Sequence, residues 1–280
     1  MNKCEQKMLD SLNMLRQEYG AISVKAEFEA EGTRTDELLR LVDLARRADL
    51  KIGLKIGGCE AARDLIESKQ FGVEYIIAPM VETPYALKKY IEVKNKIYTK
   101  DQQEYTDFLF NLETITSFNC MSDLVRVAKS KDGAQGVVFG RVDFSGSLGL
   151  PRSDIDSDSI TKYVVAAAEA CKANDLEFVV GGAVAISSLP ELRKVHKVHL
   201  TRFETRKVIF AGNALDNPKI VNGLKETVHF ELLWLQNKRD YYGDIQREDA
   251  SRIEMLETRW NKLKEGAASP SVELVNMTNA

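Results

Sequence analysis

Helical and extended hydrophobic patterns alternate along most of this chain. Residues 1–18 place Met8, Leu12 and Leu15 at helical spacing, and the next segment, AISVKAEFE, alternates between apolar and polar residues as a strand does. The same change of period recurs as far as LPELRKVH, which is helical, and VHLTRFETRKVIF, which is extended. The pattern therefore predicts seven strands, each preceded by a helix.

Regular alternation of strands and helices predicts parallel strands joined by right-handed crossovers, in either a closed barrel or a doubly wound sheet. No GxGxxG follows the first strand and no GxxxxGK[ST] occurs, so neither kind of nucleotide-binding loop is supported. The length of 280 residues is close to the roughly 250 that are typical of a βα barrel. We therefore expect an α/β protein with a (β/α)8 TIM-barrel-like fold. Either one strand is missing from this count or the barrel is incomplete at its N-terminal seam.

A long helical pattern follows the last predicted strand. Asp216 is a candidate N-cap and Pro218 falls in the first turn of a helix that runs from 216 to about 265, with one expected break at YYGD. The segment after it has no periodicity. The expected organisation is a catalytic barrel over residues 1–213, a C-terminal helical arm over 214–267 and a disordered tail over 268–280.

The composition excludes several classes of protein. Hydrophobic residues make up 44% and charged residues 29% of the chain, which is typical of a globular domain. The net charge is -3 and the basic residues are interleaved with acidic ones, so we expect no nucleic-acid partner. The apolar runs are far shorter than the roughly 20 residues that span a membrane. Scattered cysteines and an N-terminus without a secretory signal favour a cytoplasmic location.

Charged residues stand at the ends of the predicted strands, where βα barrels carry their catalytic groups. They are Glu29, Glu31, Lys55, Glu82, Glu113, Asp143, Glu204 and Arg206. Carboxylates gathered on one rim repel one another unless a cation neutralises them, and oxygen ligands suit Mg²⁺ or Mn²⁺ better than Zn²⁺. The alternative is that these acids cap the following helices. That alternative stays open for Glu82 and is disfavoured for Glu113 and Asp143, which end two adjacent inner strands.

Histidine and serine do not indicate a second kind of site. His196, His199 and His229 do not lie at predicted strand ends, so they are interpreted as surface or core residues. The serines of the FSGS segment have no accompanying histidine and aspartate pattern, which argues against a serine nucleophile.

Two of these strand ends resemble those of a known family. FNLET and the later GVVFGRVDFSGSLGLP resemble the HpcH/HpaI aldolase and citrate lyase β-subunit family, in which an apolar strand ends in Glu-Thr and a later segment carries an aspartate before Leu-Gly. GVEYIIAPMVETPYAL and EFEAEGTR are also similar to family segments, and the resemblance covers roughly residues 20–185. It implies a pyruvate-binding TIM barrel in which Glu113 and Asp143 are the two protein ligands of a divalent metal.

The chain departs from this family at two positions. Family aldolases commonly have, at the position of Glu29–Gly32, an acidic residue and a glutamate followed by a histidine that acts as the acid/base. This chain has Gly32 in place of that histidine. The family arginine that binds the 2-oxo acid carboxylate is matched by Lys55, which is cationic but lacks the two-pronged guanidinium. The missing citrate lyase N-terminal signature makes acyl-CoA substrates less expected.

The resulting hypothesis is a class II, divalent-metal-dependent aldolase or lyase that acts on a pyruvate-like 2-oxo acid and an aldehyde through a stabilised enolate. Lys55 pairs with the carboxylate, and Glu29, Glu31 or a metal-bound water replaces the histidine. Arg141 or Arg206 steadies a distal carboxylate, sugar hydroxyl or phosphate. The alternative is a catalytically divergent barrel that serves as a binding or assembly subunit.

The helical arm predicts self-association. It carries large apolar residues, namely Phe230, Leu233, Trp234, Ile253, Leu256 and Trp260. An exposed apolar surface of that extent is rare on a monomer. We therefore expect a homo-oligomer in which the arm packs on a neighbouring barrel, with packing on its own barrel as the alternative.

Overall fold

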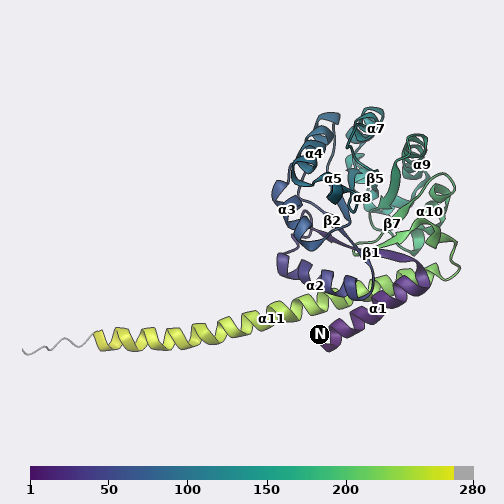
Figure 1. Cartoon of the computed structure of the whole chain (residues 1–280). Helices are drawn as coiled ribbons and strands as arrows, with labels where there is room; N and C mark the ends of the chain where they lie inside the picture. Colours follow the sequence, from purple (N-terminus) through teal and green to yellow (C-terminus); the bar gives the residue numbers. More distant parts are fainter. Residues whose placement is uncertain (268–280) are drawn as a thin grey trace, which may run out of the picture. The chain divides into compact units, whose positions relative to one another are not determined.

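A closed barrel of eight parallel and antiparallel strands forms the centre of the computed structural model, which describes residues 1–267 (Figure 1). The strands are β1 (Ala21–Glu27), β2 (Lys51–Lys55), β3 (Tyr75–Ala78), β4 (Asp107–Leu112), β5 (Gly136–Gly140), β6 (Glu177–Gly181), β7 (Arg202–Glu204) and β8 (Val208–Ala211). Neighbours from β1 to β7 are parallel. The TIM-barrel-like fold expected from the alternating pattern is confirmed.

Helices alternate with the strands and surround them (Figure 1). The α-helices are α1 (Lys3–Tyr19), α2 (Thr35–Arg47), α3 (Ala62–Phe71), α4 (Pro84–Ile97), α5 (Lys100–Gln103), α6 (Ile115–Asn119), α7 (Met121–Ala128), α8 (Arg141–Ser147), α9 (Asp158–Ala173), α10 (Leu189–His196) and α11 (Ile220–Ala267). The 3₁₀ helices are η1 (Arg152–Asp156), η2 (Ile186–Ser188) and η3 (Gly212–Asp216). No helix among these described residues is both long and apolar enough to cross a membrane.

The count of seven strands was one too low because the last extended segment contains two strands. The polar run Thr205–Lys207 turns the chain, and Thr205 N–H donates to the Val208 carbonyl at 2.9 Å. Strand β8 then runs antiparallel to both β7 and β1 and closes the barrel. A hairpin therefore replaces the helical crossover before the last strand, and a hairpin this short leaves no change of period in the sequence.

Two apolar layers stabilise the barrel. Side chains on the outer faces of the strands pack against helices, as Met8, Leu12 and Leu15 of α1 do. A smaller cluster lies inside the barrel and consists of Tyr75, Ile77, Leu109, Val138, Val179 and Ile209. Because side chains alternate along a strand, the next inward positions toward the carboxyl ends lie above this cluster, and they include Asn111, Gly140 and Gly181, which line the cavity described below.

The first turns of α11 belong to the packed unit. Residues Met1–Trp234 form one compact unit and a second begins at Leu235. Phe230 has no exposed surface, and Leu233 and Trp234 are also buried. The expectation that these three side chains pack on a neighbouring barrel is therefore wrong, because they are buried within the first unit. Packing continues past residue 213, and the proposed division into domains stays a prediction.

The outer part of α11 differs from the expectation in one further respect. The helix is continuous through Tyr241–Asp244, where a break was expected, because a single glycine within a long helical pattern is tolerated. Ile253, Leu256 and Trp260 are exposed. The tail expected to be disordered, 268–280, lies outside the described residues.

Candidate functional site

A cavity of about 830 Å³ opens at the carboxyl ends of the parallel strands. Residues of every parallel strand from β1 to β7 line it, together with the first turns of α11. All of its lining residues belong to the compact unit Met1–Trp234. Its volume is in the range of ordinary small-molecule sites and leaves room for more than a three-carbon acid.

Glu113 and Asp143 both line this cavity. Glu113 follows β4 directly and is only 1% exposed, with Oε1 accepting the Met80 N–H at 2.8 Å and Oε2 accepting Asn111 Nδ2–H at 2.6 Å. The space that it occupies depends on Gly140 of β5, where a Cβ would lie 2.8 Å from Glu113 Oε2. The two carboxylates therefore meet because their strands are adjacent in the barrel.

Helix capping does not account for either carboxylate. Thr114, not Glu113, caps α6 by accepting the Ser117 N–H. Asp143 lies in the first turn of α8 without a capping hydrogen bond and makes no hydrogen bond or ion pair with the described residues. For Glu82 the cap of the following helix α4 is its neighbour Thr83, and Glu82 itself is exposed and does not line the cavity.

Lys55 lies beside this pair. Its Nζ is 3.1 Å from Glu29 Oε2 and 3.6 Å from Glu113 Oε2. Lys55 therefore contacts two other residues that were selected from the sequence. Burial acts to lower the pKa of Lys55, but Glu113 and Glu29 outweigh it and the pKa is raised. Burial raises the pKa of Glu113, with Asp143 adding to the effect, against the opposing influence of Lys55 and the two hydrogen bonds. We call Lys55, Glu29 and Glu113 the Lys55 cluster.

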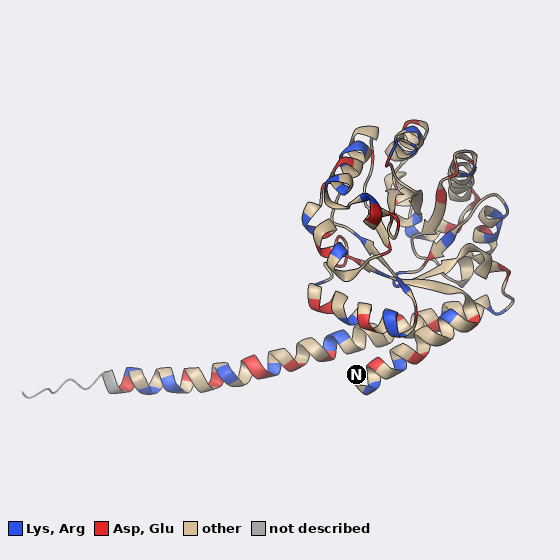
Figure 2. Cartoon of the chain, viewed as in Figure 1, with Lys and Arg blue, Asp and Glu red and all other residues tan. Residues whose placement is uncertain are grey.

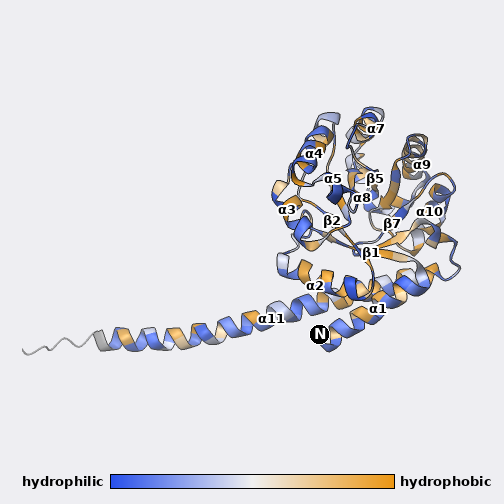
Figure 3. Cartoon of the chain, viewed as in Figure 1, coloured by the Kyte–Doolittle hydropathy of each residue, from blue (hydrophilic) through white to orange (hydrophobic). Residues whose placement is uncertain are grey.

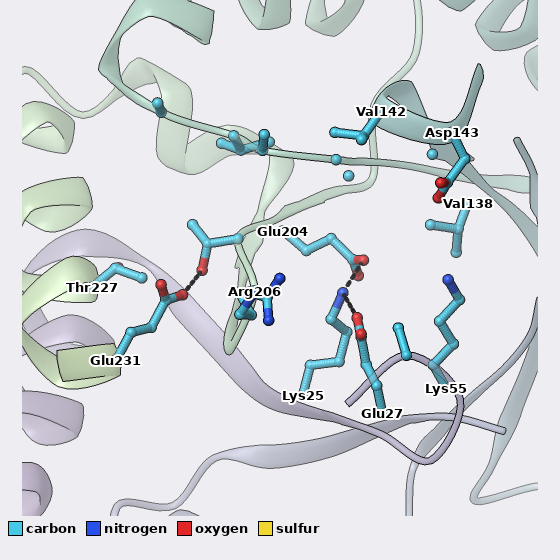
Figure 4. Close-up of a pocket in the computed structure, with 18 of the residues that line it drawn as sticks. Lys25, Glu27, Lys55, Val138, Val142, Asp143, Glu204, Arg206, Thr227 and Glu231 are labelled. Carbon is cyan, nitrogen blue, oxygen red and sulfur yellow. Dashed lines mark hydrogen bonds and ion pairs between the residues drawn. The ribbon is translucent and has the colours of Figure 1, made fainter. Parts of the chain in front are cut away.

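A second charged cluster was missed in the sequence except for one member, Glu204. Lys25 Nζ lies 2.6 Å from Glu204 Oε1 and 3.1 Å from Glu27 Oε1, and all three residues line the cavity (Figure 4). Gly181 leaves space for Glu204, since a Cβ there would lie 2.9 Å from Glu204 Oε1. We call Lys25, Glu27 and Glu204 the Lys25 cluster.

Ion pairing dominates the electrostatics of the Lys25 cluster. Lys25 is 6% exposed, and burial acts to lower its pKa, yet the two carboxylates raise it. Burial acts to raise the pKa of Glu27, but Lys25 and more distant lysines lower it overall. The available signal in the sequence was the spacing, because Ser23, Lys25 and Glu27 occupy alternate positions of a buried strand and so share its inner face.

Besides Glu82, two residues selected from the sequence do not line the cavity. Glu31 forms ion pairs with Lys207 and with Arg206, the latter at 3.4 Å. Arg141 is 2% exposed and its guanidinium pairs with Asp156 at 2.6 Å and donates to the carbonyls of Gly181 and Gly182. Its donors are committed to holding β5 next to β6, so we do not assign Arg141 to the cavity. Arg206 does line it, at the exposed rim.

The donor set at Glu113 and Asp143 consists of oxygen atoms. Asn111 adds a third, because it lines the cavity and its Oδ1 is buried without a hydrogen-bond partner. Hard divalent cations such as Mg²⁺ prefer these ligands, so the residues fit such an ion. Within residues 1–267 no three or more His, Cys, Asp or Glu side chains form a metal-binding group. An ion held by Glu113 and Asp143 would therefore take its remaining ligands from other oxygens, water or substrate.

The chain belongs to the HpcH/HpaI aldolase/citrate lyase family, whose sequence pattern matches residues 38–194. This confirms the resemblance carried by the strand-end motifs. The family is of the aldolase and citrate lyase type, which supports a lyase function in general. No curated protein matches the chain.

Solved structures agree on the fold. The citrate synthase SbnG is 16% identical, with a TM-score of 0.59, over 85% of this chain and 90% of that one. An HpcH/HpaI aldolase from Desulfitobacterium hafniense DCB-2 is 12% identical, with a TM-score of 0.54, over 65% of this chain and 76% of that one. An HpcH/HpaI aldolase/citrate lyase family protein from Burkholderia cenocepacia J2315 is 11% identical, with a TM-score of 0.55, over 81% and 99%. At these identities the similarity shows the fold and not the substrate.

Proposed function

We propose that this protein is a class II aldolase or lyase, dependent on Mg²⁺ or Mn²⁺, that makes or breaks a carbon-carbon bond next to a pyruvate-like 2-oxo acid. The observation that carries this proposal is the pair of carboxylates from adjacent strands, Glu113 and Asp143, in one cavity with Lys55. Glu29, Glu113 and Asp143 carry three negative charges against the single positive charge of Lys55. A bound divalent cation would balance that excess and would supply Lewis-acid stabilisation of the enolate charge.

The protein's own groups have distinct roles in this scheme. Lys55 binds the 2-oxo acid carboxylate as a cation, and the buried Glu113 fixes the position of its ammonium. Glu29 is the proton carrier in place of the histidine of related aldolases, because it lines the cavity and contacts Lys55, whereas Glu31 is held by Lys207 and Arg206. The hydrogen bonds from Met80 and Asn111 hold Glu113 in one orientation.

The Lys25 cluster suits the second substrate, an aldehyde. An ammonium group has three donors, and within residues 1–267 only two carboxylates contact that of Lys25, which leaves the third donor to a ligand in the cavity. The net charge of the cluster is negative, which disfavours an anion and favours hydroxyl groups that both donate and accept. We infer a preference for hydroxylated aldehydes, so glyceraldehyde should be a better acceptor than propanal, and equal rates with both would contradict this inference.

Proton exchange tests the central proposal without knowledge of the acceptor. In D₂O with Mg²⁺ or Mn²⁺, the protein should exchange the methyl protons of pyruvate, measured by NMR, because enolate formation precedes bond formation. Glu113→Gln and Asp143→Asn should both abolish the exchange, with loss of more than about 100-fold in rate.

Glu82→Gln is the matched control, since Glu82 also follows a strand but is exposed and outside the cavity. It should exchange at the wild-type rate. Exchange that persists in Glu113→Gln would refute the ligand assignment. A wild-type protein that neither binds metal nor exchanges protons would instead be a binding or assembly subunit.

A further inference from the structure

The outer surface of α11 carries a regular stripe of residues spaced alternately four and three positions apart. Its members within the described residues are Val228, Leu232, Leu235, Arg239, Tyr242, Gln246, Asp249, Ile253, Leu256, Trp260 and Leu263. We call them the α11 stripe. Seven of the eleven are aliphatic or Trp, and these seven are 53–65% exposed, which is unusual for such side chains. Hydrophobic segments recur along the helix between hydrophilic ones (Figure 3).

This spacing is the heptad repeat of a coiled coil. Apolar residues separated alternately by three and four positions repeat every 3.5 residues on average, and they form a seam that packs against a second helix. From Val228 to Leu263 the stripe is about 54 Å long at the rise of an α-helix and covers five heptads. The first three and the last four members of the stripe are apolar, and between them stand Arg239, Tyr242, Gln246 and Asp249.

Charged members of the stripe indicate which partner covers it. Arg239 and Asp249 lie in the seam, and charges of both signs alternate along α11 (Figure 2). In a parallel pairing in register each of them would face its own copy, so two like-charged contacts would lie in the seam. An antiparallel pairing of identical helices brings Arg239 opposite Asp249 of the second copy, and the twofold symmetry makes this ion pair twice.

We propose that α11 pairs with α11 of a second copy of this chain as an antiparallel coiled coil centred on Asp244. In this register the residue numbers of opposed seam positions always sum to the same value. Leu235 then faces Ile253, and Leu232 faces Leu256, each from the second copy. Val228 faces Trp260 of the second copy in the same way, so apolar contacts flank the two Arg239–Asp249 pairs on both sides.

One residue beside the seam, Ile245, agrees with this register. Ile245, next to the centre, is 42% exposed, and the symmetry would place it beside Ile245 of the second copy. Glu231 is not available to the second copy, because its carboxylate accepts from Thr205 Oγ1 at 2.9 Å and from the Lys207 N–H at 3.0 Å. Lys238 and Arg252 would flank each other as like charges at the edge of the seam, where water screens them.

Charge reversal in the seam tests the proposal on the full-length protein by sedimentation equilibrium. The wild-type chain should be a dimer, or a larger oligomer containing this contact. Asp249→Arg should weaken that association at least about 100-fold, because it sets two pairs of arginines against each other. Arg239→Asp combined with Asp249→Arg should restore it to within about tenfold, since the opposite charges are only exchanged.

Glu254→Arg is the matched control, because it makes the same change of charge on the exposed face of α11 outside the stripe. It should associate as the wild type does, and circular dichroism should show the same helix content in all four proteins. A wild-type monomer at tens of micromolar would overturn the proposal. So would unchanged association of Asp249→Arg, which is the result expected for a contact elsewhere, or a double variant that is not restored while its helix is intact.

Discussion

The Lys25 cluster and the Lys55 cluster are built from the same residue types in one barrel, but they differ in how fully their charges are satisfied. In each cluster one lysine contacts two glutamates: Lys25 contacts Glu27 and Glu204, and Lys55 contacts Glu29 and Glu113. In each, a glycine on a neighbouring strand leaves space for the more buried glutamate. Lys25 is held at 2.6 and 3.1 Å, whereas the distances of Lys55 are 3.1 and 3.6 Å.

Asp143 marks the functional difference between the two clusters. It adds a negative charge near Glu113. The pKa of Glu113 is raised, mainly by burial and further by Asp143. Burial also acts to raise the pKa of Glu27, but Lys25 outweighs it and the pKa of Glu27 is lowered. Both carboxylates of the Lys25 cluster are paired with its lysine, and one negative charge remains in excess. The Lys55 cluster together with Asp143 has two negative charges in excess, and Asp143 has no ion-pair partner within residues 1–267. The Lys55 cluster is incompletely balanced, which is the condition under which a site gains from a bound cation.

Removing each lysine should produce the largest contrast. Lys25→Met removes the ion-pair partner of Glu204, which is buried, and of Glu27, and should lower the free energy of unfolding by about 3–5 kcal/mol. Lys55→Met should lower it by only about 1–2 kcal/mol, because Glu113 keeps its two hydrogen bonds and Glu29 is partly exposed. Urea denaturation of both variants measures this, and equal losses would mean that the two clusters do not differ in stability.

Neutralising one buried glutamate in each cluster should change stability in opposite directions. Glu204→Gln removes an ion-paired carboxylate and should lower the free energy of unfolding by about 2 kcal/mol. Glu113→Gln, measured in EDTA at neutral pH, should leave it equal or higher, because a raised pKa means that the fold disfavours the charged form. A clear destabilisation by Glu113→Gln would show that Lys55 already balances that carboxylate.

Divalent metal should separate the clusters by ligand binding. Mg²⁺ or Mn²⁺ at 100 times its dissociation constant should stabilise the wild-type protein by about 2.7 kcal/mol. Asp143→Asn should abolish this stabilisation, whereas Glu204→Gln should retain it even though it starts from a less stable protein. Thermal unfolding with and without the metal makes the comparison. A metal response that disappears in Glu204→Gln and survives in Asp143→Asn would reverse the assignment of the two clusters.

The smallest expected effect is on the pH dependence of stability. Because the pKa of Glu27 is lowered in the folded protein, its contribution is present above the pKa of an unfolded glutamate and is lost as the pH falls through the folded value. Glu27→Gln should therefore reduce the slope of stability against pH in the acid range, as followed by urea titrations at several pH values. An unaltered slope would indicate that Glu27 does not gain from Lys25 on folding.

The barrel and its carboxylate pair were predictable because the information for both is local. A change of hydrophobic period marks each strand and helix, and parallel strands bring their carboxyl ends to one rim, so Glu113 and Asp143 had to lie near each other once the fold was a barrel. Lys55 was identified in the same way from the end of β2. The family match over residues 38–194 includes these same strand ends.

Contacts between distant segments were decided only by the tertiary structure. Lys25 meets Glu204 across 179 positions of the chain, and the spacing of Ser23, Lys25 and Glu27 indicates a shared face of the strand but not this partner. Arg141 turns toward Asp156 instead of the cavity, and β8 runs antiparallel because a three-residue turn suffices to reverse the chain. The sequence by itself determined the first six strands and where each of them ends, but not the division of the last extended segment into β7 and β8. The closed barrel decided which charges face each other, because burial makes every inward charge depend on a partner from another strand.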